Sequence, residues 1–174
     1  MRTCSADEVG WILLQRRDVQ ATSNDNNIFE RMKWSEYKSG FEEQNKAYWY
    51  GLQKMHEKTS SGRWKVALVY RCGGGDKCAV FNDFKIEGEN EKFKLHVGAK
   101  VSQKRFPTGS TLDYNNDMAF TTSDSDNDKL GSRNCAVSNI ILGGWWHKDC
   151  AYYCPNCKFL NSDCTHTFMV MKRI

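Results

Sequence analysis

The segment from Asp124 to Cys150 constrains the fold of this chain more than any other stretch of the sequence. It consists of D-S-D-N-D-K-L-G-S-R-N-C and, after a short spacer, G-G-W-W-H-K-D-C. Because Asp124, Asp126 and Asp128 alternate with other residues, a looped backbone can turn their carboxylates toward one hard cation. Calcium takes six to eight oxygen ligands, and such a loop supplies carboxylates and backbone carbonyls. The segment is therefore either a calcium-binding loop or an acidic loop that is simply solvated.

The two cysteines of this segment favour the calcium interpretation. Cys150 lies fifteen residues after Cys135, and a disulfide closing a loop of this size contributes roughly 3 kcal/mol in the chain-entropy model. Such a crosslink would hold the carbonyls of the loop still, as an ion site requires. The EF-hand pattern is excluded, because Lys129 stands where that loop needs glycine and Cys135 where it needs a bidentate glutamate. We therefore expect a Cys135–Cys150 disulfide and a calcium loop of another kind.

Length and composition fit one extracellular domain. The chain has 174 residues, enough for a single domain with a substantial core, and its apolar fraction of 40% is typical of a globular fold. Eight cysteines, an even number, indicate an oxidising compartment, so we expect a secreted, extracellular protein although the sequence has no signal peptide. A net charge of +4, with acids and bases interspersed, predicts no nucleic-acid partner. No apolar run is long enough to predict membrane insertion.

Periodic segments predict a sheet with two helices beside it. A short helix is expected from Ser35 to Gly40, the terminating residue, and a second within 44–58, where Trp49 and Leu52 lie close to one face. The expected strands are Val9–Arg17, 64–70, 78–86 and 93–98.

A glycine-rich segment, C-G-G-G-D-K-C, separates two of the expected strands. Its three glycines can adopt positive φ, so a tight hairpin can close and bring Cys72 and Cys78 together. We therefore expect a local disulfide between these two cysteines. The segment is not a phosphate-binding loop, because no Gly-Lys-Ser/Thr follows it.

Several separated motifs, in unbroken order over roughly residues 4–150, resemble one known family. They are G-W-I-L-L-Q-R-R at 10–17, W-S-E-Y-K-S-G-F at 34–41, A-Y-W-Y-G-L at 47–52, F-K-L-H-V-G at 93–98, M-A-F-T-T-S-D-S-D-N-D-K-L, N-C-A-V and G-G-W-W-H-K-D-C. Together they resemble the fibrinogen C-terminal domain, the family of the fibrinogen globes, ficolins, tachylectin-type lectins, angiopoietins and tenascins.

The resemblance implies an α+β fold with a central, mostly antiparallel sheet, short flanking helices and a loop-rich region that binds calcium and ligand. Residues 1–174 would form a single domain. Within it we expect a sheet and helix core at 4–121, calcium and pocket loops at 122–164, and a closing strand at 165–174.

The resemblance also implies the site residues. One calcium ion would be held by the carboxylates of Asp126 and Asp128 and by backbone carbonyls near Leu130 and Ser132, with Asp124 outside the first shell. In the acetyl-binding lectins of the family a cis peptide precedes the pocket cysteine, which would be the Asp149–Cys150 bond here. The ligand pocket beside the ion would involve Trp146, His147, Asp149, Cys150, Ala151 and Tyr152.

The C-terminal region departs from the family pattern. Ala151 replaces the usual histidine, and most of the Trp-rich portion that completes the pocket is missing. The extra cysteines offer zinc as an alternative ion, with Cys154, Cys157, Cys164 and His166 as ligands. Disulfides compete with that interpretation, and Cys4 or Cys157 paired with Cys164 are plausible connectivities. In the family the equivalent of Cys4 pairs with an upstream cysteine that is missing here, so Cys4 would be free, pair with another chain, or pair with an extra C-terminal cysteine.

Three functions follow from these observations. The first is a secreted, calcium-binding recognition module that binds acetylated carbohydrate or pathogen surfaces, as innate-immune lectins do. The second is a protein-interaction or matrix module that binds a cell-surface protein and uses calcium only structurally. The third is a shortened scaffold that has lost ligand binding. We expect no enzyme and no catalytic residues, because the sequence has no G-x-S-x-G, H-E-x-x-H, P-loop or dinucleotide motif. Oligomerisation is left open.

Overall fold

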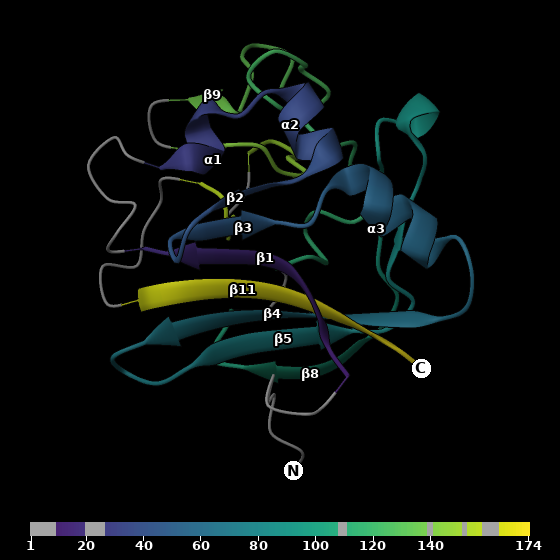
Figure 1. Ribbon diagram of the computed structural model, residues 1–174, viewed down its shortest axis with the longest axis vertical. Helices are drawn as coiled ribbons and strands as arrows, with labels where there is room; N and C mark the ends of the chain where they lie inside the picture. The colour runs from purple at the N-terminus through teal and green to yellow at the C-terminus, as the bar shows by residue number, and fades with distance from the viewer. Residues whose placement is uncertain (1–9, 20–26, 108–110, 139–140, 151–152, 158–163) are drawn as a thin grey trace.

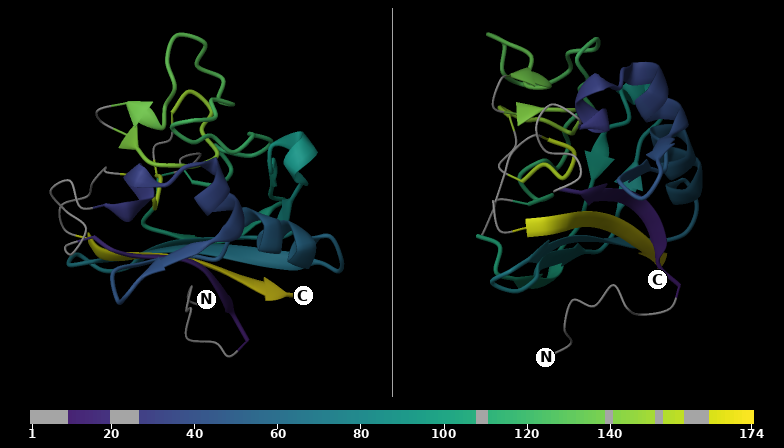
Figure 2. Two further views of the ribbon diagram at one scale, coloured as in Figure 1. Left: turned by 45° about the horizontal axis from the view of Figure 1, so that its top comes forward. Right: turned by 60° about the vertical axis from the view of Figure 1, so that its left-hand side comes forward.

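The structure is a computed structural model that describes residues 10–19, 27–107, 111–138, 141–150, 153–157 and 164–174. Its main element is a seven-stranded sheet, and Figure 2 shows the helices and the long loops stacked on one face of it. The strand order is β2-β3-β1-β11-β4-β5-β8, and every neighbouring pair is antiparallel. The α+β fold expected from the sequence, with a mostly antiparallel sheet and short helices, is therefore confirmed (Figure 1).

The elements are short apart from two strands. The main sheet contains β1 (Ile12–Asp18), β2 (Phe41–Glu43), β3 (Ala47–Trp49), β4 (Trp64–Cys72), β5 (Lys77–Phe81), β8 (Lys100–Lys104) and β11 (Cys164–Arg173). Two small sheets pair β6 (Lys85–Ile86) with β7 (Leu95–His96) and β9 (Val137–Ser138) with β10 (Ile141–Leu142). The helices are α1 (Ile28–Arg31), α2 (Trp34–Ser39), α3 (Leu52–Thr59) and the 3-10 turn η1 (Glu89–Glu91).

The segment 44–58 is only partly helical, so the helix expected there is wrong in its first half. Ala47 and Trp49 are buried and alternate with the half-buried Tyr48, which is the period of a strand rather than a helix. The helix α3 begins only after Gly51, whose φ of 102° suits glycine and whose Cβ position lies 2.7 Å from the Ser39 carbonyl oxygen. The strand expected at 93–98 is likewise reduced to β7 (Leu95–His96), and β8 (Lys100–Lys104) takes the edge of the main sheet.

The disulfide expected between Cys72 and Cys78 is wrong, because the two residues are out of register. Across the β4–β5 hairpin Cys78 stands opposite Val69, whereas Cys72 is the last residue of β4, and its carbonyl accepts from the Gly75 N–H at 2.9 Å at the start of the turn. Cys72 stands directly opposite Cys164 of β11 and is crosslinked to it. Cys78 is also disulfide-bonded.

The two pairings considered for Cys164 are settled in the same way. Cys157 is bonded to Cys154 and Cys164 to Cys72, so both expected pairings, Cys157–Cys164 and Cys4–Cys164, are wrong. Cys4 lies outside the described residues. These crosslinks are typical of proteins from an oxidising compartment. In the described part of the chain no helix has the length and hydropathy to cross a bilayer.

The aromatic core between the sheet and the loops fixes the position of the Gly-Gly-Trp-Trp segment. Tyr37 of α2 is fully buried, and its hydroxyl donates to the Phe29 carbonyl at 2.7 Å and accepts from the Gly144 N–H at 2.9 Å. A Cβ at Gly144 would lie 2.5 Å from the Tyr37 ring, so the backbone can approach the ring only because this residue is glycine. Trp145 and Trp146 follow with no exposed surface. Helix α2 and the loop region are thereby joined through the core.

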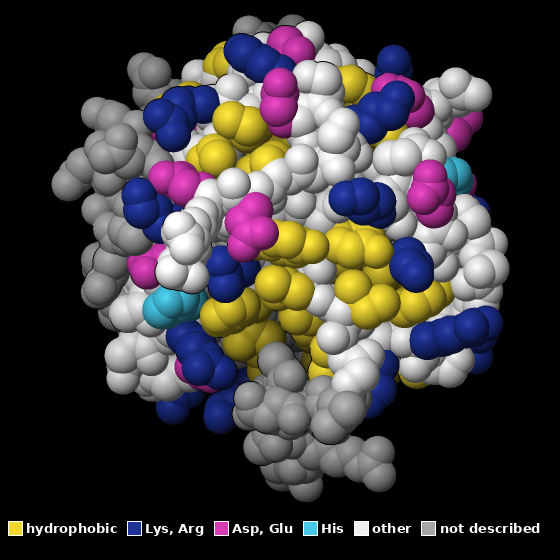
Figure 3. Space-filling view, in the orientation of Figure 1, with side chains coloured by type: hydrophobic (Ala, Val, Ile, Leu, Met, Phe, Trp, Pro, Cys, Tyr) yellow, Lys and Arg dark blue, Asp and Glu magenta, His cyan; other side chains and the backbone are white. Residues whose placement is uncertain are grey.

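The surface of the domain is mixed in charge. On the face shown in Figure 3, basic and acidic side chains are interspersed, and hydrophobic side chains gather over the middle of the sheet.

Candidate functional site

The acidic loop is attached to the Gly-Gly-Trp-Trp segment at both of its ends. At its start Thr121 and Trp145 exchange two backbone hydrogen bonds, with N–O distances of 2.9 and 3.1 Å. Further along, the Lys129 N–H donates to the Lys148 carbonyl at 2.7 Å. At its end Cys135 is crosslinked to Cys150, which confirms the disulfide expected from the sequence. The loop is thus held to residues 145–150 by three separate connections.

Asp124 is directed toward helix α2. Its Oδ1 accepts from the Thr122 hydroxyl at 2.7 Å and from the backbone N–H of Trp34, the first residue of the helix, at 3.0 Å. Burial alone would raise the pKa of Asp124, but these hydrogen bonds outweigh it and the pKa is lowered. Asp124 therefore connects the loop to the helix as an anion.

Asp128 is oriented by the backbone of the same loop. Its Oδ1 accepts from the Leu130 N–H at 2.7 Å and its Oδ2 from the Cys135 N–H at 2.8 Å. The neighbouring Asp126 is exposed, and its Oδ1 lies 3.4 Å from the Asp128 N–H. In the described part of the chain no lysine or arginine forms an ion pair with either carboxylate. Two carboxyl groups thus share one turn with no basic partner in that part of the chain.

These residues fit a calcium ion in the chemistry of their donors. Asp126 and Asp128 supply hard carboxylate oxygens, and the exposed residue Ser132 adds a backbone carbonyl. The Leu130 carbonyl accepts from the Arg133 N–H at 3.2 Å, and a carbonyl oxygen with two lone pairs retains room for a cation. A bound cation would offset the charge that the two aspartates leave uncompensated.

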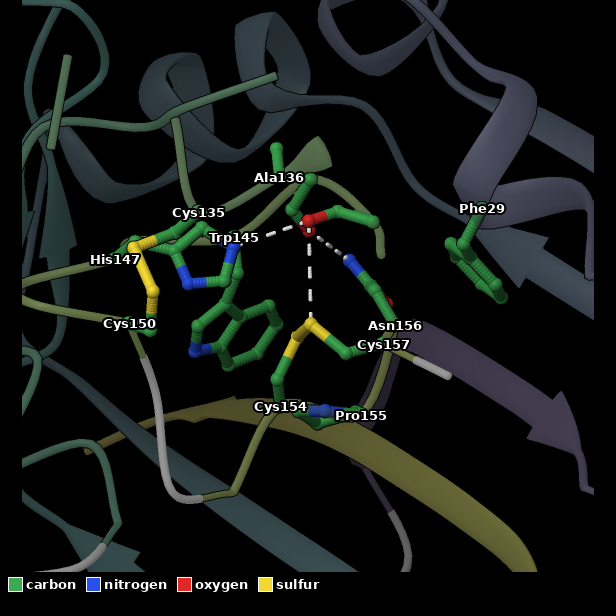
Figure 4. The surroundings of a disulfide bond; sticks show 12 residues. Phe29, Cys135, Ala136, Trp145, His147, Cys150, Cys154, Pro155, Asn156 and Cys157 are labelled. Carbon is green, nitrogen blue, oxygen red and sulfur yellow. Dashed lines mark hydrogen bonds between the residues drawn. A yellow bond between two sulfur atoms is a disulfide. The ribbon is translucent and has the colours of Figure 1, made fainter. Parts of the chain in front are cut away.

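Trp146 and His147, expected as pocket residues, are both core residues with no exposed surface. The Trp146 indole N–H donates to the Phe93 carbonyl at 2.8 Å. The ring of His147 approaches the Gly143 carbonyl through Nε2 at 3.1 Å (Figure 4). Both side chains therefore pack in the core beneath the acidic loop and are not exposed to solvent.

The other expected pocket residues lie nearer the surface. Asp149 is exposed, and its Oδ1 accepts from the hydroxyl of Tyr114 at 2.6 Å. Cys150 is only 8% exposed. The described residues contain no cis peptide, so the expected cis bond before Cys150 is wrong; a φ of 59° at Cys150 turns the chain there. Ala151 and Tyr152 lie outside the described residues.

Tyr114 is the surface residue that sequence analysis missed. The Nζ of Lys148 lies 5.4 Å from the centre of its ring, so Tyr114, Lys148 and Asp149 form one polar and aromatic cluster beside the Cys135–Cys150 crosslink. Tyr114 precedes Asp149 by 35 residues, and no local motif connects them. Only the fold brings them together.

The four residues considered for zinc do not converge. Cys154 is bonded to Cys157 and Cys164 to Cys72, so these sulfurs have no thiolate to offer while they are oxidised. The ring of His166 stacks on Phe168, and its Nε2 lies 3.8 Å from the Asp18 carboxylate.

The buried His147 predicts acid sensitivity. Burial lowers its pKa to about 4, against the opposing effects of the Gly143 hydrogen bond and the Asp126 charge, so the folded state favours the neutral ring. This contribution to stability is complete above the unfolded pKa of about 6.5 and is lost as the pH falls from there toward 4, by up to about 3 kcal/mol. We expect the unfolding free energy in urea to fall more between pH 7 and pH 4 in the wild type than in His147→Gln. Equal falls in the two proteins would contradict this origin.

Comparison with known proteins places this chain in a family. The family model for the C-terminal globular domain of the fibrinogen beta and gamma chains matches residues 3–170. Human tenascin-R is 34% identical over 146 residues, which is 84% of this chain and 10% of that protein. Human ficolin-3 is 32% identical over 142 residues, which is 81% of this chain and 44% of that protein. The chain therefore spans a small part of tenascin-R and less than half of ficolin-3.

A solved structure has the same architecture. The fibrinogen-like globe domain of human ANGPTL6 superimposes with a TM-score of 0.78 at 25% identity, covering 95% of this chain and 78% of that one. This chain is therefore similar to its relatives in both sequence and structure. The chain belongs to the family of fibrinogen C-terminal globular domains, which are recognition and interaction modules.

Proposed function

We propose that this domain is a secreted, calcium-binding recognition module that binds acetylated carbohydrate at the surface beside its acidic loop. The observation that carries the proposal is the pair Asp126 and Asp128, held in one crosslinked turn with no basic partner among the residues that the structure describes. The relatives ficolin-3 and tenascin-R support a role in recognition, and the disulfides support secretion.

The residues of the chain have distinct roles in this proposal. Asp126 and Asp128, with backbone carbonyls near Leu130 and Ser132, hold the ion, which supplies positive charge that orders the loop when bound. The backbone N–H groups of Leu130 and Cys135 orient the Asp128 carboxylate beforehand. The disulfide between Cys135 and Cys150 connects the ordered loop to the ligand surface and restricts the motion of that surface.

The ligand surface in this proposal is the cluster of Tyr114, Lys148 and Asp149. The carboxylate of Asp149 accepts hydrogen bonds from sugar hydroxyls, and the ammonium of Lys148 donates to an acetyl oxygen. The ring of Tyr114 offers an apolar face to a methyl group or a sugar ring. Both charged residues are exposed and available for such contacts.

A second candidate is a protein-interaction module in which calcium is structural. It is favoured by the burial of Trp146 and His147, because a small-molecule pocket would expose aromatic lining to its ligand. The two candidates differ in a binding experiment on an N-acetylated sugar resin. Retention that requires calcium and ends with acetate or chelator supports the lectin. Passage through the resin, with capture of a cell-surface protein, supports the interaction module. Passage with neither activity, in a folded protein, leaves the shortened scaffold.

Calcium binding itself is tested by charge-matched variants within the loop. In the wild type, calcium at a hundred times its dissociation constant is expected to add ~2.7 kcal/mol to the free energy of unfolding. Asp126→Asn replaces a carboxylate ligand by a neutral amide oxygen, so this increment is expected to fall well below that of the wild type. Asp124→Asn has the same charge change in the same loop but alters only the contacts with Thr122 and Trp34, so the calcium increment should survive. The increment is measured by urea unfolding with and without calcium, and the stoichiometry by calorimetric titration. A calcium increment that survives undiminished in Asp126→Asn would show that the ion is not held there.

A further inference from the structure

Three potential metal ligands outside the acidic loop converge in the core. One donor atom from each of His147, Cys154 and Cys157 lies within 4.8 Å of the other two, and all three residues are buried. Figure 4 shows the imidazole of His147 facing the Cys154–Cys157 disulfide. Two thiolates and an imidazole are the donors that zinc selects, and C-x-x-C is the spacing by which zinc sites commonly take two ligands from one turn.

The Gly143 carbonyl supplies a fourth donor at the same point. Its oxygen lies 3.1 Å from His147 Nε2 and 3.9 Å from Cys157 Sγ, and both interactions are drawn as dashed lines in Figure 4. Ordinary zinc–ligand bond lengths in a tetrahedron separate neighbouring donors by roughly 3.3–3.8 Å. The nitrogen–oxygen and sulfur–oxygen separations therefore already approach those of a tetrahedral site. The two sulfurs are too close, because they are bonded to each other, and the His147 donor lies within 4.8 Å of both.

The surrounding backbone is held independently of that disulfide. Gly143 has a φ of 129°, and a Cβ there would lie 2.7 Å from the Asn156 carbonyl oxygen, so the two segments are in close contact. The Asn156 side chain donates to the Gly144 carbonyl at 2.9 Å, and Asn27 donates to the Asn156 carbonyl at 3.0 Å. The Arg17 guanidinium donates to the Cys157 carbonyl. These contacts would keep the turn in place after the sulfurs separate.

We propose that reduction of the Cys154–Cys157 disulfide creates a buried zinc site formed by the two cysteine thiolates, His147 Nε2 and the Gly143 carbonyl. A dithiol reductant breaks the S–S bond, gives two electrons and two protons to the cysteine sulfurs, and itself becomes a disulfide. Zinc then displaces the two thiol protons to solvent, so the charge of the ion is balanced by two thiolates. The imidazole proton resides on Nδ1 in this state. Before the metal binds, that proton is on Nε2 and is donated to the Gly143 carbonyl, so metal binding moves it to Nδ1.

This site differs from the calcium loop in chemistry and from the earlier zinc alternative in residues. Soft thiolates do not suit calcium, and the carboxylates of Asp126 and Asp128 do not suit a site that selects thiolates. Of the four residues considered for zinc from the sequence, Cys164 and His166 take no part, and His147 replaces them. The inference therefore stands or fails independently of the proposed lectin function.

The test uses cobalt(II) as a coloured probe on the full chain. The protein is reduced with a phosphine, which does not compete for the metal as a dithiol does, and is titrated without oxygen. The wild type is expected to bind one cobalt ion with the absorption of tetrahedral coordination and a thiolate-to-cobalt charge-transfer band. Cys154→Ala/Cys157→Ala keeps every other cysteine of the chain and should lose both features. His147→Gln should weaken cobalt binding by at least about tenfold. Excess calcium should displace nothing.

Two results would overturn the proposal. One is the same cobalt spectrum in the wild type and in Cys154→Ala/Cys157→Ala, since other thiols would then bind the ion. The other is unchanged affinity in His147→Gln. If the phosphine unfolds the wild type, cobalt is instead present during refolding under reducing conditions. The proposal then requires recovery of the near-ultraviolet circular dichroism together with the tetrahedral spectrum, and failure to recover both counts against it.

Discussion

Replacing Cys72 and Cys164 by alanine is expected to lower the free energy of unfolding by about 4–5 kcal/mol. The crosslink joins residues 92 positions apart, so it removes much of the conformational freedom of the unfolded chain. The native state should keep its sheet, because the eight other paired positions between β4 and β11 do not depend on the sulfur bond. Unfolding in guanidinium chloride measures the loss, and the m-value should rise as the unfolded chain expands.

The Cys154→Ala/Cys157→Ala variant is the matched control for this prediction. It also replaces two cysteines by alanine, but the crosslink it removes spans only three positions. For such a short loop the chain-entropy model gives about 2 kcal/mol. The long crosslink should therefore matter at least twice as much as the short one. Equal losses in the two variants would mean that constraint of the unfolded chain is not the source of the stabilisation.

Trp146→Ala is expected to cost about 3–5 kcal/mol of folding stability. The indole has no exposed surface and packs against Trp49, Phe120 and Trp145, with ring centres 6.2, 5.0 and 5.0 Å away. Its removal leaves a cavity and deprives the Phe93 carbonyl of its donor. Thermal and urea unfolding measure the loss directly.

A second variant shows whether Trp146 has a role in the core or in ligand binding. Trp34→Ala serves as the control, because Trp34 is only partly buried and lies at the edge of the same aromatic cluster. Its loss should be clearly smaller. If Trp146→Ala instead kept full stability and lost only sugar binding, the residue would belong to the ligand surface.

The sequence predicted best where a feature depends on neighbours in the chain. Gly40 ends helix α2 as expected, and Cys135 reaches Cys150 because a short loop returns the chain to the same place. The prediction for Cys72 was wrong because its pairing depends on the register between strands of the sheet. Residue types and spacing around the glycine turn do not reveal that β11 lies on the other side of β4.

The candidate site shows the same limit. The D-x-D-x-D pattern identified the acidic loop, but it treats three carboxylates alike. In the structure Asp124 accepts a hydrogen bond from the backbone N–H of Trp34, whereas Asp126 and Asp128 lie together in the loop. This difference arises from the contact between α2 and the loop. Tyr114 could not be predicted at all, because its contact with Asp149 depends on tertiary structure.

The place of β11 in the sheet has a consequence for how the protein is made. It is the last strand in chain order, yet it lies between β1 and β4. During synthesis β1 and β4 therefore cannot pair with β11 until it has been translated. Cys72 likewise cannot form its disulfide until Cys164, 92 residues later, has been made. At ordinary rates of translation that delay is roughly 5–20 s. Throughout it the Cys72 thiol can react with other cysteines, so oxidative folding should depend on a disulfide isomerase that can undo wrong bonds.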